Sequence, residues 1–290
     1  MHRSPETARL REEIAELAPW HIEVEVAPGL STRTSLDAPA PTEGPKDVGR
    51  VAFVDARDWW HRLVRTIYPE GLQGRSMLDC ACNCGAYLFW SRELGAGDCF
   101  GFDARKHWID QARFLARARR DGEIRFEERD LYGLPELGLA PFDLVLFKGI
   151  LYHLPEPVAG LKIAADLAGE VLIVDTAFRS DLPDYGLAIG RESPIPVMSG
   201  IHGLNWFPTG PRVIARMLGW MGFPIVRLIH RRSHSPDNPS IGRVGLIAAR
   251  TGGLIENFEP LDRAGDFSVI GRHSVIRPRA SRPGEVSPPG

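Results

Sequence analysis

The sequence lacks the features that mark several large classes of protein. Its 290 residues carry 35 Lys and Arg against 37 Asp and Glu, so the basic excess typical of dedicated nucleic-acid binders is missing. No apolar stretch is long enough to span a bilayer, and we expect no signal peptide at the N-terminus. These absences predict a globular protein with no membrane partner, and they disfavour a polyanionic partner.

Cysteine is also scarce, and the spacing of the four cysteines excludes two further roles. Cys80, Cys82 and Cys84 alternate within one segment, and Cys99 follows later. This spacing is neither that of a disulfide scaffold nor the C-x-x-C pair of common zinc sites. We therefore expect no metal site and a reducing, cytoplasmic location.

The sequence does contain a regular alternation of apolar strands and amphipathic helices. The predicted strands are 76–82, 99–103, 123–130, 142–149, 170–176, 224–231 and 243–250. The predicted helices between them are 86–94, 106–120, 157–168 and 210–221. Strands that alternate with helices and are apolar throughout indicate a parallel sheet that is covered on both faces. We predict an α/β fold, with a Rossmann-like, mostly parallel, seven-stranded sheet and helices on both faces.

Three regions fall outside this alternation and suggest a division of the chain. Residues 1–50 are predicted to form an N-terminal extension or lid, since 27–49 are rich in proline and glycine. Residues 51–252 form the main domain, in which the proline-rich 177–208 is an inserted cap region. Residues 253–290 are polar and rich in Arg, Pro and Gly, and they are predicted to be a mobile tail.

The first predicted core strand ends in a turn that suits a bound ligand. Asp79 stands near the strand end, and the small residues Ala81, Cys82 and Gly85 with Asn83 follow it. Small side chains let a ligand approach the backbone, and glycine adopts dihedrals closed to other residues. Ligands of open α/β sheets bind beyond the carboxyl ends of the strands.

Two further acids end the next two predicted strands. Asp103 follows the glycine turn by about 20 residues, where a carboxylate can accept two hydrogen bonds from ribose hydroxyls. Asp130 could accept a hydrogen bond from the exocyclic amine of adenine, or could simply cap the following turn. The dinucleotide pattern G-x-G-x-x-G and the P-loop lysine are both missing, which disfavours NAD binding and nucleotide hydrolysis.

These motifs resemble those of class I S-adenosylmethionine-dependent methyltransferases over roughly residues 50 to 250. The similar segments are LDCACNCG (78–85), FDLVLFKGILYHLPEP (142–157) and GLNWFPTGPRVIARMLGWMGF (203–223). They most resemble a subgroup that contains the tRNA wobble-uridine carboxymethyltransferases and related uncharacterised methyltransferases. Ala81 stands in place of the usual glycine, and we expect cofactor binding to survive this change if the position keeps a negative φ.

The resemblance implies S-adenosyl-L-methionine as the cofactor and implies which residues surround it. Asp79, Asn83 and Gly85 would line the methionine end, and Asp103 would hold the ribose. The full predicted cofactor set is Asp79, Cys82, Asn83, Gly85, Asp103, Asp130, Leu131, Lys148 and Gly149. In this set Asp130 and Leu131 would border the adenine, while Lys148 and Gly149 would begin the loop under the sulfonium.

The acceptor is expected beyond the fourth core strand, where Tyr152 and His153 are the catalytic candidates. His153 could remove a proton from an acceptor hydroxyl, or it could pack beneath the loop. Methyl transfer is an in-line displacement that alignment alone can accelerate. The predicted acceptor-binding residues are Trp59, His202, Asn205 and Trp206, although the tryptophans could equally serve packing.

The sequence leaves three functions open. The near-neutral charge and the two proline-rich regions favour O-methylation of a small-molecule acceptor, with tRNA disfavoured as a partner. The alternative is methyl or carboxymethyl transfer to a tRNA wobble uridine. The resembling tRNA enzymes use a carboxylated cofactor that needs cationic partners, and Leu154 stands where they carry a basic residue. A non-catalytic relative of the fold is the third hypothesis, and Asp79, Gly85 and Asp103 argue against it.

Overall fold

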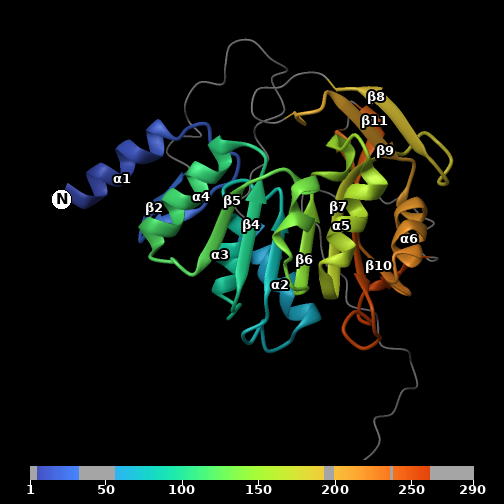
Figure 1. Cartoon of the computed structure of the whole chain (residues 1–290), viewed down its shortest axis with the longest axis horizontal. Coiled ribbons are helices and arrows are strands. Elements are labelled where there is room, and N and C mark those ends of the chain that lie inside the picture. Colours follow the sequence, from blue (N-terminus) through green and yellow to red (C-terminus); the bar gives the residue numbers. More distant parts are fainter. Residues whose placement is uncertain (1–4, 33–55, 193–198, 236–237, 262–290) are drawn as a thin grey trace, which may run out of the picture.

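The computed structural model describes residues 5–32, 56–192, 199–235 and 238–261. Its centre is a single sheet of eight strands in the order β12-β10-β11-β7-β6-β3-β4-β5 (Figure 1). The parallel strands are β3 (Met77–Cys80), β4 (Cys99–Asp103), β5 (Ile124–Glu128), β6 (Phe142–Lys148) and β7 (Ala168–Arg179). β10 (Ile225–Ser235), β11 (Asn238–Ala249) and β12 (Glu259–Pro260) complete the sheet as antiparallel neighbours. The predicted fold class is confirmed.

The eighth strand comes from the segment that was predicted to be a mobile tail. β12 pairs with β10, and the preceding side chains of Ile255 and Phe258 are fully buried. The prediction for 253–290 is therefore wrong as far as residue 261, because these two apolar side chains fix the segment to the sheet. The rest of the predicted tail lies outside the described residues.

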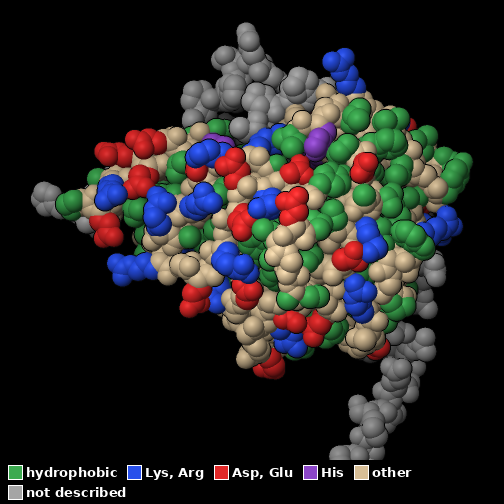
Figure 2. All heavy atoms as spheres, in the orientation of Figure 1, with side chains coloured by type: hydrophobic (Ala, Val, Ile, Leu, Met, Phe, Trp, Pro, Cys, Tyr) green, Lys and Arg blue, Asp and Glu red, His purple; other side chains and the backbone are tan. Residues whose placement is uncertain are grey.

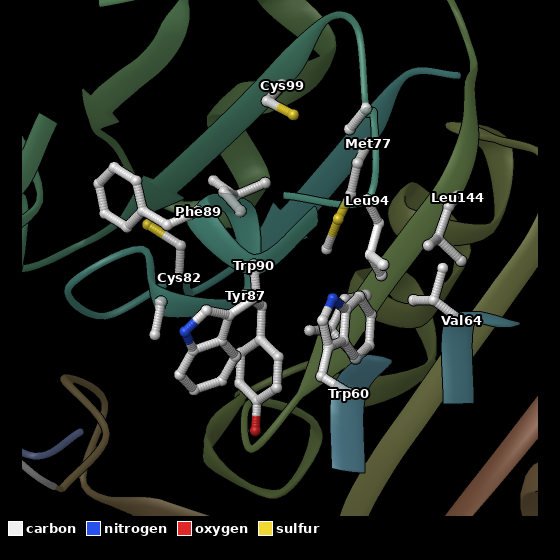
Figure 3. Packing of buried hydrophobic residues seen from close by; sticks show 14 of the residues in the cluster. Trp60, Val64, Met77, Cys82, Tyr87, Phe89, Trp90, Leu94, Cys99 and Leu144 are labelled. Carbon is white, nitrogen blue, oxygen red and sulfur yellow. The ribbon is translucent and has the colours of Figure 1, made fainter. Parts of the chain in front are cut away.

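Helices cover both faces of the sheet. Successive residues of a strand point to opposite faces, so a strand that is apolar throughout needs cover on both. Met77 and Leu144 point to one face, where they pack with α2 (Ala56–Ile67), α3 (Ala86–Arg92) and α4 (Lys106–Arg119). Figure 3 shows this layer around Trp60 and Trp90. The neighbouring residues Leu78 and Val145 point to the other face, where α5 (Pro157–Asp166) and α6 (Pro211–Trp220) lie. The central strands β3, β4, β6 and β7 are thus buried on both sides over most of their length, which explains their apolar sequences, whereas the edge strand β5 has one exposed face.

The described part of the N-terminal extension packs against α4. It comprises α1 (Pro5–Glu16) and a short hairpin of β1 (Glu25–Ala27) and β2 (Leu30–Ser31). The ring of Trp20 lies 6.1 Å from that of Phe114, and the Gln111 amide donates to the carbonyls of Leu17 and Pro19. Residues 33–50 of the predicted lid lie outside the described residues.

The region predicted as an insertion contains a separate two-stranded sheet. β8 (Leu187–Arg191) and β9 (Leu204–Pro208) pair with each other, and β9 packs on the short 3-10 helix η4 (Leu151–His153). The hairpin therefore lies beyond the carboxyl ends of β6 and β7 (Figure 1). It places Asn205 and Glu192 beside the predicted acceptor region.

The surface in Figure 2 carries mixed charges, with blue and red side chains interspersed over the α4 side. Arg113 of α4 donates to the carbonyl of Phe126, and Arg117 pairs with Glu13 of α1. Within the described part of the chain, no helix is both long enough and apolar enough to cross a membrane.

Candidate active site

The turn after β3, residues 81–85, has an unusual backbone that we call the cofactor turn. Ala81, Asn83 and Gly85 all have positive φ, at 55°, 54° and 79°. The condition of a negative φ at Ala81 is not met, and alanine pays roughly 1–2 kcal/mol in this region. A side chain at Gly85 would meet the Phe126 ring at 2.6 Å, so glycine is required there. The backbone of the turn thus has the positive φ angles that glycine adopts most readily, although alanine and asparagine occupy two of its positions.

Asp103 joins the cofactor turn to the end of β4. Its carboxylate accepts hydrogen bonds from the backbone N–H of Asn83 at 3.1 Å and of Arg105 at 3.0 Å. The residue is only 6% exposed, and burial raises its pKa to about 6, although both hydrogen bonds oppose that shift. The carboxylate is therefore fixed in place and has remaining lone pairs for ribose hydroxyls.

Asp79 is a buried carboxylate with an unused hydrogen-bonding atom. It is 2% exposed, and its Oδ2 has no hydrogen-bond partner among the described residues. Burial raises its pKa well above the usual range, the charge of Asp103 adds to the shift, and Lys148 opposes it. An unpaired buried carboxylate is unfavourable, and a cationic ligand group would relieve it. The ammonium and ribose of S-adenosylmethionine fit Asp79 and Asp103 respectively.

The remaining residues predicted at the adenine end have structural partners of their own. Asp130 accepts the N–H of Tyr132 at 2.8 Å and caps η3 (Leu131–Leu137). Leu131 and Cys82 are both 2% exposed. Cys82 belongs to the core on the face of the sheet that α2, α3 and α4 cover, and Leu131 belongs to the core on the face that α5 and α6 cover. The Nε2 atom of His202 lies 3.6 Å from Asp130 Oδ2, so His202 meets the predicted adenine end. Their roles toward the cofactor stay predictions.

A buried ion cluster lies at the carboxyl ends of β6 and β7. We define it as Lys148, Asp175, His230 and Arg243. Asp175 Oδ2 is 3.2 Å from Lys148 Nζ and 2.9 Å from His230 Nε2, while its Oδ1 accepts from Arg243 Nε. Burial raises the pKa of Asp175, but Arg243 and Lys148 together hold it well below the usual value. Two partly buried cations thus share one buried carboxylate.

The ion cluster touches the predicted sulfonium loop and the catalytic candidates. Burial lowers the pKa of Lys148 to about 8, in spite of Asp175. Gly149, at a φ of 76°, lies against the Arg243 guanidinium, and Tyr152 forms a side-chain hydrogen bond with Arg243. Sequence reasoning missed Asp175, although it ends the predicted strand 170–176. It also missed Arg243, which reaches the site from an antiparallel strand much later in the chain.

The four predicted acceptor-binding residues have different neighbours. Trp59 packs edge-on to His230 with ring centroids 6.4 Å apart, while its neighbour Trp60 is fully buried and donates to Ser91 Oγ. Asn205 Nδ2 donates to the Tyr152 carbonyl at 3.4 Å. Trp206 follows Asn205 on a strand and therefore points to the opposite face of the hairpin.

The catalytic candidates Tyr152 and His153 lie on η4, under the β8–β9 hairpin. Tyr152 stacks on Phe207 with ring centroids 5.8 Å apart. His153 Nδ1 is 2.7 Å from Glu192 Oε1. Sequence reasoning missed Glu192, because nothing in the proline-rich region marked it.

The sheet order, the cofactor turn and the acid at the end of β4 are those expected of a class I S-adenosylmethionine-dependent methyltransferase domain. Residues 72–189 match the family model described as a methyltransferase domain. The structure is similar to the N-terminal domain of EvdMO1 in the presence of SAH and D-fucose, with a TM-score of 0.65 and 20% identity. That match covers 86% of this chain and 98% of the other and shows the shared fold.

Curated relatives carry a more particular name. A tRNA U34 carboxymethyltransferase of Campylobacter hominis is 38% identical over 110 residues, which cover 37% of this chain and 38% of the relative. The same name belongs to a protein of Idiomarina loihiensis, 30% identical over 208 residues, which cover 67% of this chain and 60% of the relative. The chain thus spans less than two thirds of the length of these relatives.

The comparisons decide two of the predictions. The resemblance to class I S-adenosylmethionine-dependent methyltransferases is confirmed, together with the enzyme class and the cofactor. The prediction of a small-molecule acceptor, with tRNA disfavoured, is wrong, because the relatives are repeatedly named for tRNA. The error arose because the near-neutral net charge of the chain was taken as evidence against a tRNA partner.

Proposed function

We propose that this chain transfers a carboxymethyl group to the wobble uridine of a tRNA, with a carboxylated S-adenosylmethionine as the donor. The names of the relatives support the acceptor, as several tRNA U34 carboxymethyltransferases match this chain. A cytoplasmic location belongs to the same proposal, because tRNA resides in that compartment. The structure supports the donor through one observation, the charge of the ion cluster.

The ion cluster has more positive than negative charge. The side chains of Lys148 and Arg243 are only 21% and 15% exposed, and Asp175 is the one acid that they share. His230 adds no compensating charge, because burial lowers its pKa. Asp79, whose Oδ2 has no hydrogen-bond partner among the described residues, is left for the ammonium of the donor. A carboxylate beside the sulfonium would therefore find a cationic partner, and such a pair at 4 Å is worth about 4 kcal/mol at an effective dielectric of 20.

Leu154 does not weaken this proposal, although similar tRNA enzymes carry a basic residue there. Its side chain is 4% exposed and packs in the core beside Leu131. A Cβ added to Gly160 would meet Leu154 Cδ1 at 2.4 Å, so the leucine fills the space over α5. Position 154 is thus part of the core in this chain, and the cationic charge of the site comes from other strands.

The test compares the two donors on the same tRNA. Full-length protein would be incubated with tRNA whose wobble uridine lacks the side group, and with either the carboxylated or the ordinary cofactor. Digestion and mass spectrometry of the nucleosides would show which group was transferred. We expect a carboxymethylated product with the carboxylated donor and turnover at least tenfold slower with S-adenosylmethionine.

Variants connect that preference to the ion cluster. Arg243→Gln should abolish the preference for the carboxylated donor. Arg125→Gln removes the same charge from an exposed position on the edge strand β5 and should leave the preference unchanged. Equal turnover with both donors in the unaltered protein would count against the carboxylated donor. Absence of any product on tRNA would overturn the acceptor.

A further inference from the structure

A buried tyrosine that the proposed function does not use lies beside the ion cluster. Tyr87 is the second residue of α3 and is 6% exposed. Its ring packs edge-on against Trp60 and Trp90, with ring centroids 5.1 and 5.2 Å apart. Figure 3 shows the Tyr87 ring between these two tryptophans, with its hydroxyl oxygen beyond their rings. The aromatic contacts therefore fix the ring and leave the hydroxyl at the edge of the packed layer.

The acids of the site point to the same face of the sheet as Tyr87. Asp79 of β3 and Asp175 of β7 are each two residues from a core residue of the layer under α2, α3 and α4, so both point to that layer. Burial raises the pKa of Tyr87, the charges of Asp175 and Asp79 add to the shift, and Arg243 opposes it. The Tyr87 hydroxyl therefore keeps its proton and lies within electrostatic reach of both Asp79 and the ion cluster.

The Tyr87 hydroxyl and the Asp79 carboxylate both have unused hydrogen-bonding capacity. No hydrogen bond joins the hydroxyl to the described part of the chain, and Asp79 Oδ2 has no partner there either. A buried tyrosine hydroxyl normally has a hydrogen-bond partner, because leaving it unpaired away from water is unfavourable. One free donor and one free acceptor therefore lie in the same layer, at the carboxyl ends of the strands.

The amino-acid end of S-adenosylmethionine constrains where its own carboxylate can lie. Its ammonium and its α-carboxylate are bonded to one carbon atom, so the partners of the two groups must be close together. Asp79 fits the ammonium, while the cations Lys148 and Arg243 already share Asp175. Tyr87 is a neutral donor within reach of Asp79 and is not engaged elsewhere in the described part of the chain.

We infer that the Tyr87 hydroxyl donates a hydrogen bond to the α-carboxylate of the donor, beside the ammonium that Asp79 accepts. S-adenosylmethionine and its carboxylated form both carry this α-carboxylate, so the inference depends neither on carboxymethyl transfer nor on tRNA. Tyr87 thereby makes the site selective for an adenosyl sulfonium that carries a complete amino acid, since a few placed polar groups set the specificity of a buried pocket.

Calorimetry of the full chain with two ligands tests this contact. Decarboxylated S-adenosylmethionine keeps the adenosyl, sulfonium and ammonium groups of S-adenosylmethionine and lacks only the α-carboxylate. Tyr87→Phe removes the hydroxyl and retains the ring between Trp60 and Trp90. It should raise the Kd for S-adenosylmethionine roughly 10- to 100-fold, the usual effect of losing a hydrogen bond to a charged group, and leave the Kd for the decarboxylated form within about twofold. The variant should thus lose most of the preference of the unaltered protein for the ligand with the carboxylate.

Tyr68→Phe is the matched control, because it also removes one phenol oxygen from a buried ring. The Tyr68 hydroxyl donates to Glu170 Oε2 at 3.0 Å, near the start of β7 and therefore at the opposite end of the sheet from the cofactor turn. This variant should bind both ligands with unchanged Kd. Retained binding of the decarboxylated form by Tyr87→Phe shows in the same experiment that this variant is folded.

Three results would overturn the inference. An equal rise in Kd for both ligands would show that Tyr87 only supports the packing around the cofactor turn. An unchanged Kd for both would show that the hydroxyl does not touch the donor. A rise confined to the carboxylated donor, with S-adenosylmethionine unaffected, would assign the hydroxyl to the added carboxylate instead. None of these measurements involves tRNA, so failure of the inference is distinguishable from failure of the proposed function.

Discussion

The cofactor turn and the ion cluster lie at the same edge of the sheet but are held in different ways. In the cofactor turn, the Asp103 carboxylate is bound by backbone N–H groups of Asn83 and Arg105. In the ion cluster, Asp175 is bound by side chains from three other strands. The first arrangement depends on local backbone conformation, and the second depends on the complete sheet. Perturbing one residue in each region should therefore have different consequences.

The largest expected effect is the loss of the acid at the centre of the ion cluster. Asp175→Asn leaves Lys148 and Arg243 buried without their carboxylate, and breaking a buried pair in this way costs about 3–5 kcal/mol. Urea unfolding at pH 7 measures that loss. Asp166→Asn breaks a surface pair with Lys162 and should change stability by less than about 1 kcal/mol. Equal effects of the two variants would show that the cluster is solvated.

The pH dependence of stability should report on the cofactor turn. The folded pKa of Asp103 is raised to about 6, so its contribution to stability is full below pH 4 and is lost as the pH rises through 6. The ligand-free protein should therefore gain up to roughly 3 kcal/mol between pH 7 and pH 4 from this group. Asp175 does not offset this gain, since its depressed pKa acts only below that window. Urea titrations of both proteins at several pH values should show this gain as the part of the pH dependence that Asp103→Asn loses.

Cofactor affinity should separate the two regions further. Asp103→Ala removes the carboxylate proposed for the ribose, and loss of hydrogen bonds to a charged group is worth about 1.5–3 kcal/mol. The Kd for S-adenosylmethionine should then rise roughly 10- to 100-fold in calorimetry. Arg243→Gln should leave the Kd for this cofactor within a fewfold of the original value. The opposite ranking would contradict the assignment of the two regions.

The smallest effect is a gain in stability at the cofactor turn. Ala81→Gly relieves a positive φ that alanine tolerates poorly, so it should stabilise the protein by about 1 kcal/mol. Thermal unfolding would show it as an increase in Tm. Asn83→Gly is the matched control, because asparagine adopts this conformation more readily and its Oδ1 accepts the Cys84 N–H. A lower Tm for Ala81→Gly would contradict the argument.

The same contrast explains what the sequence could predict. Asp79, Gly85 and Asp103 follow apolar strands in a recognisable order, so local patterns were enough to propose them. Asp175 and Arg243 meet across 68 residues, and Glu192 reaches His153 through an irregular hairpin. Such contacts depend on how strands are ordered in the sheet, which periodicity does not specify. The positive φ of Ala81 was not foreseen either, since the turn overrides the preference of the residue.

The short strand β12 has a practical consequence for work on this protein. It covers part of the outer edge of β10, and Ile255 and Phe258 anchor it there. A protein truncated at residue 252, where the main domain was predicted to end, would leave β10 without this neighbour. An uncovered edge strand is a template for pairing between molecules. Expression variants should accordingly retain the chain through residue 261 if they are to stay monodisperse.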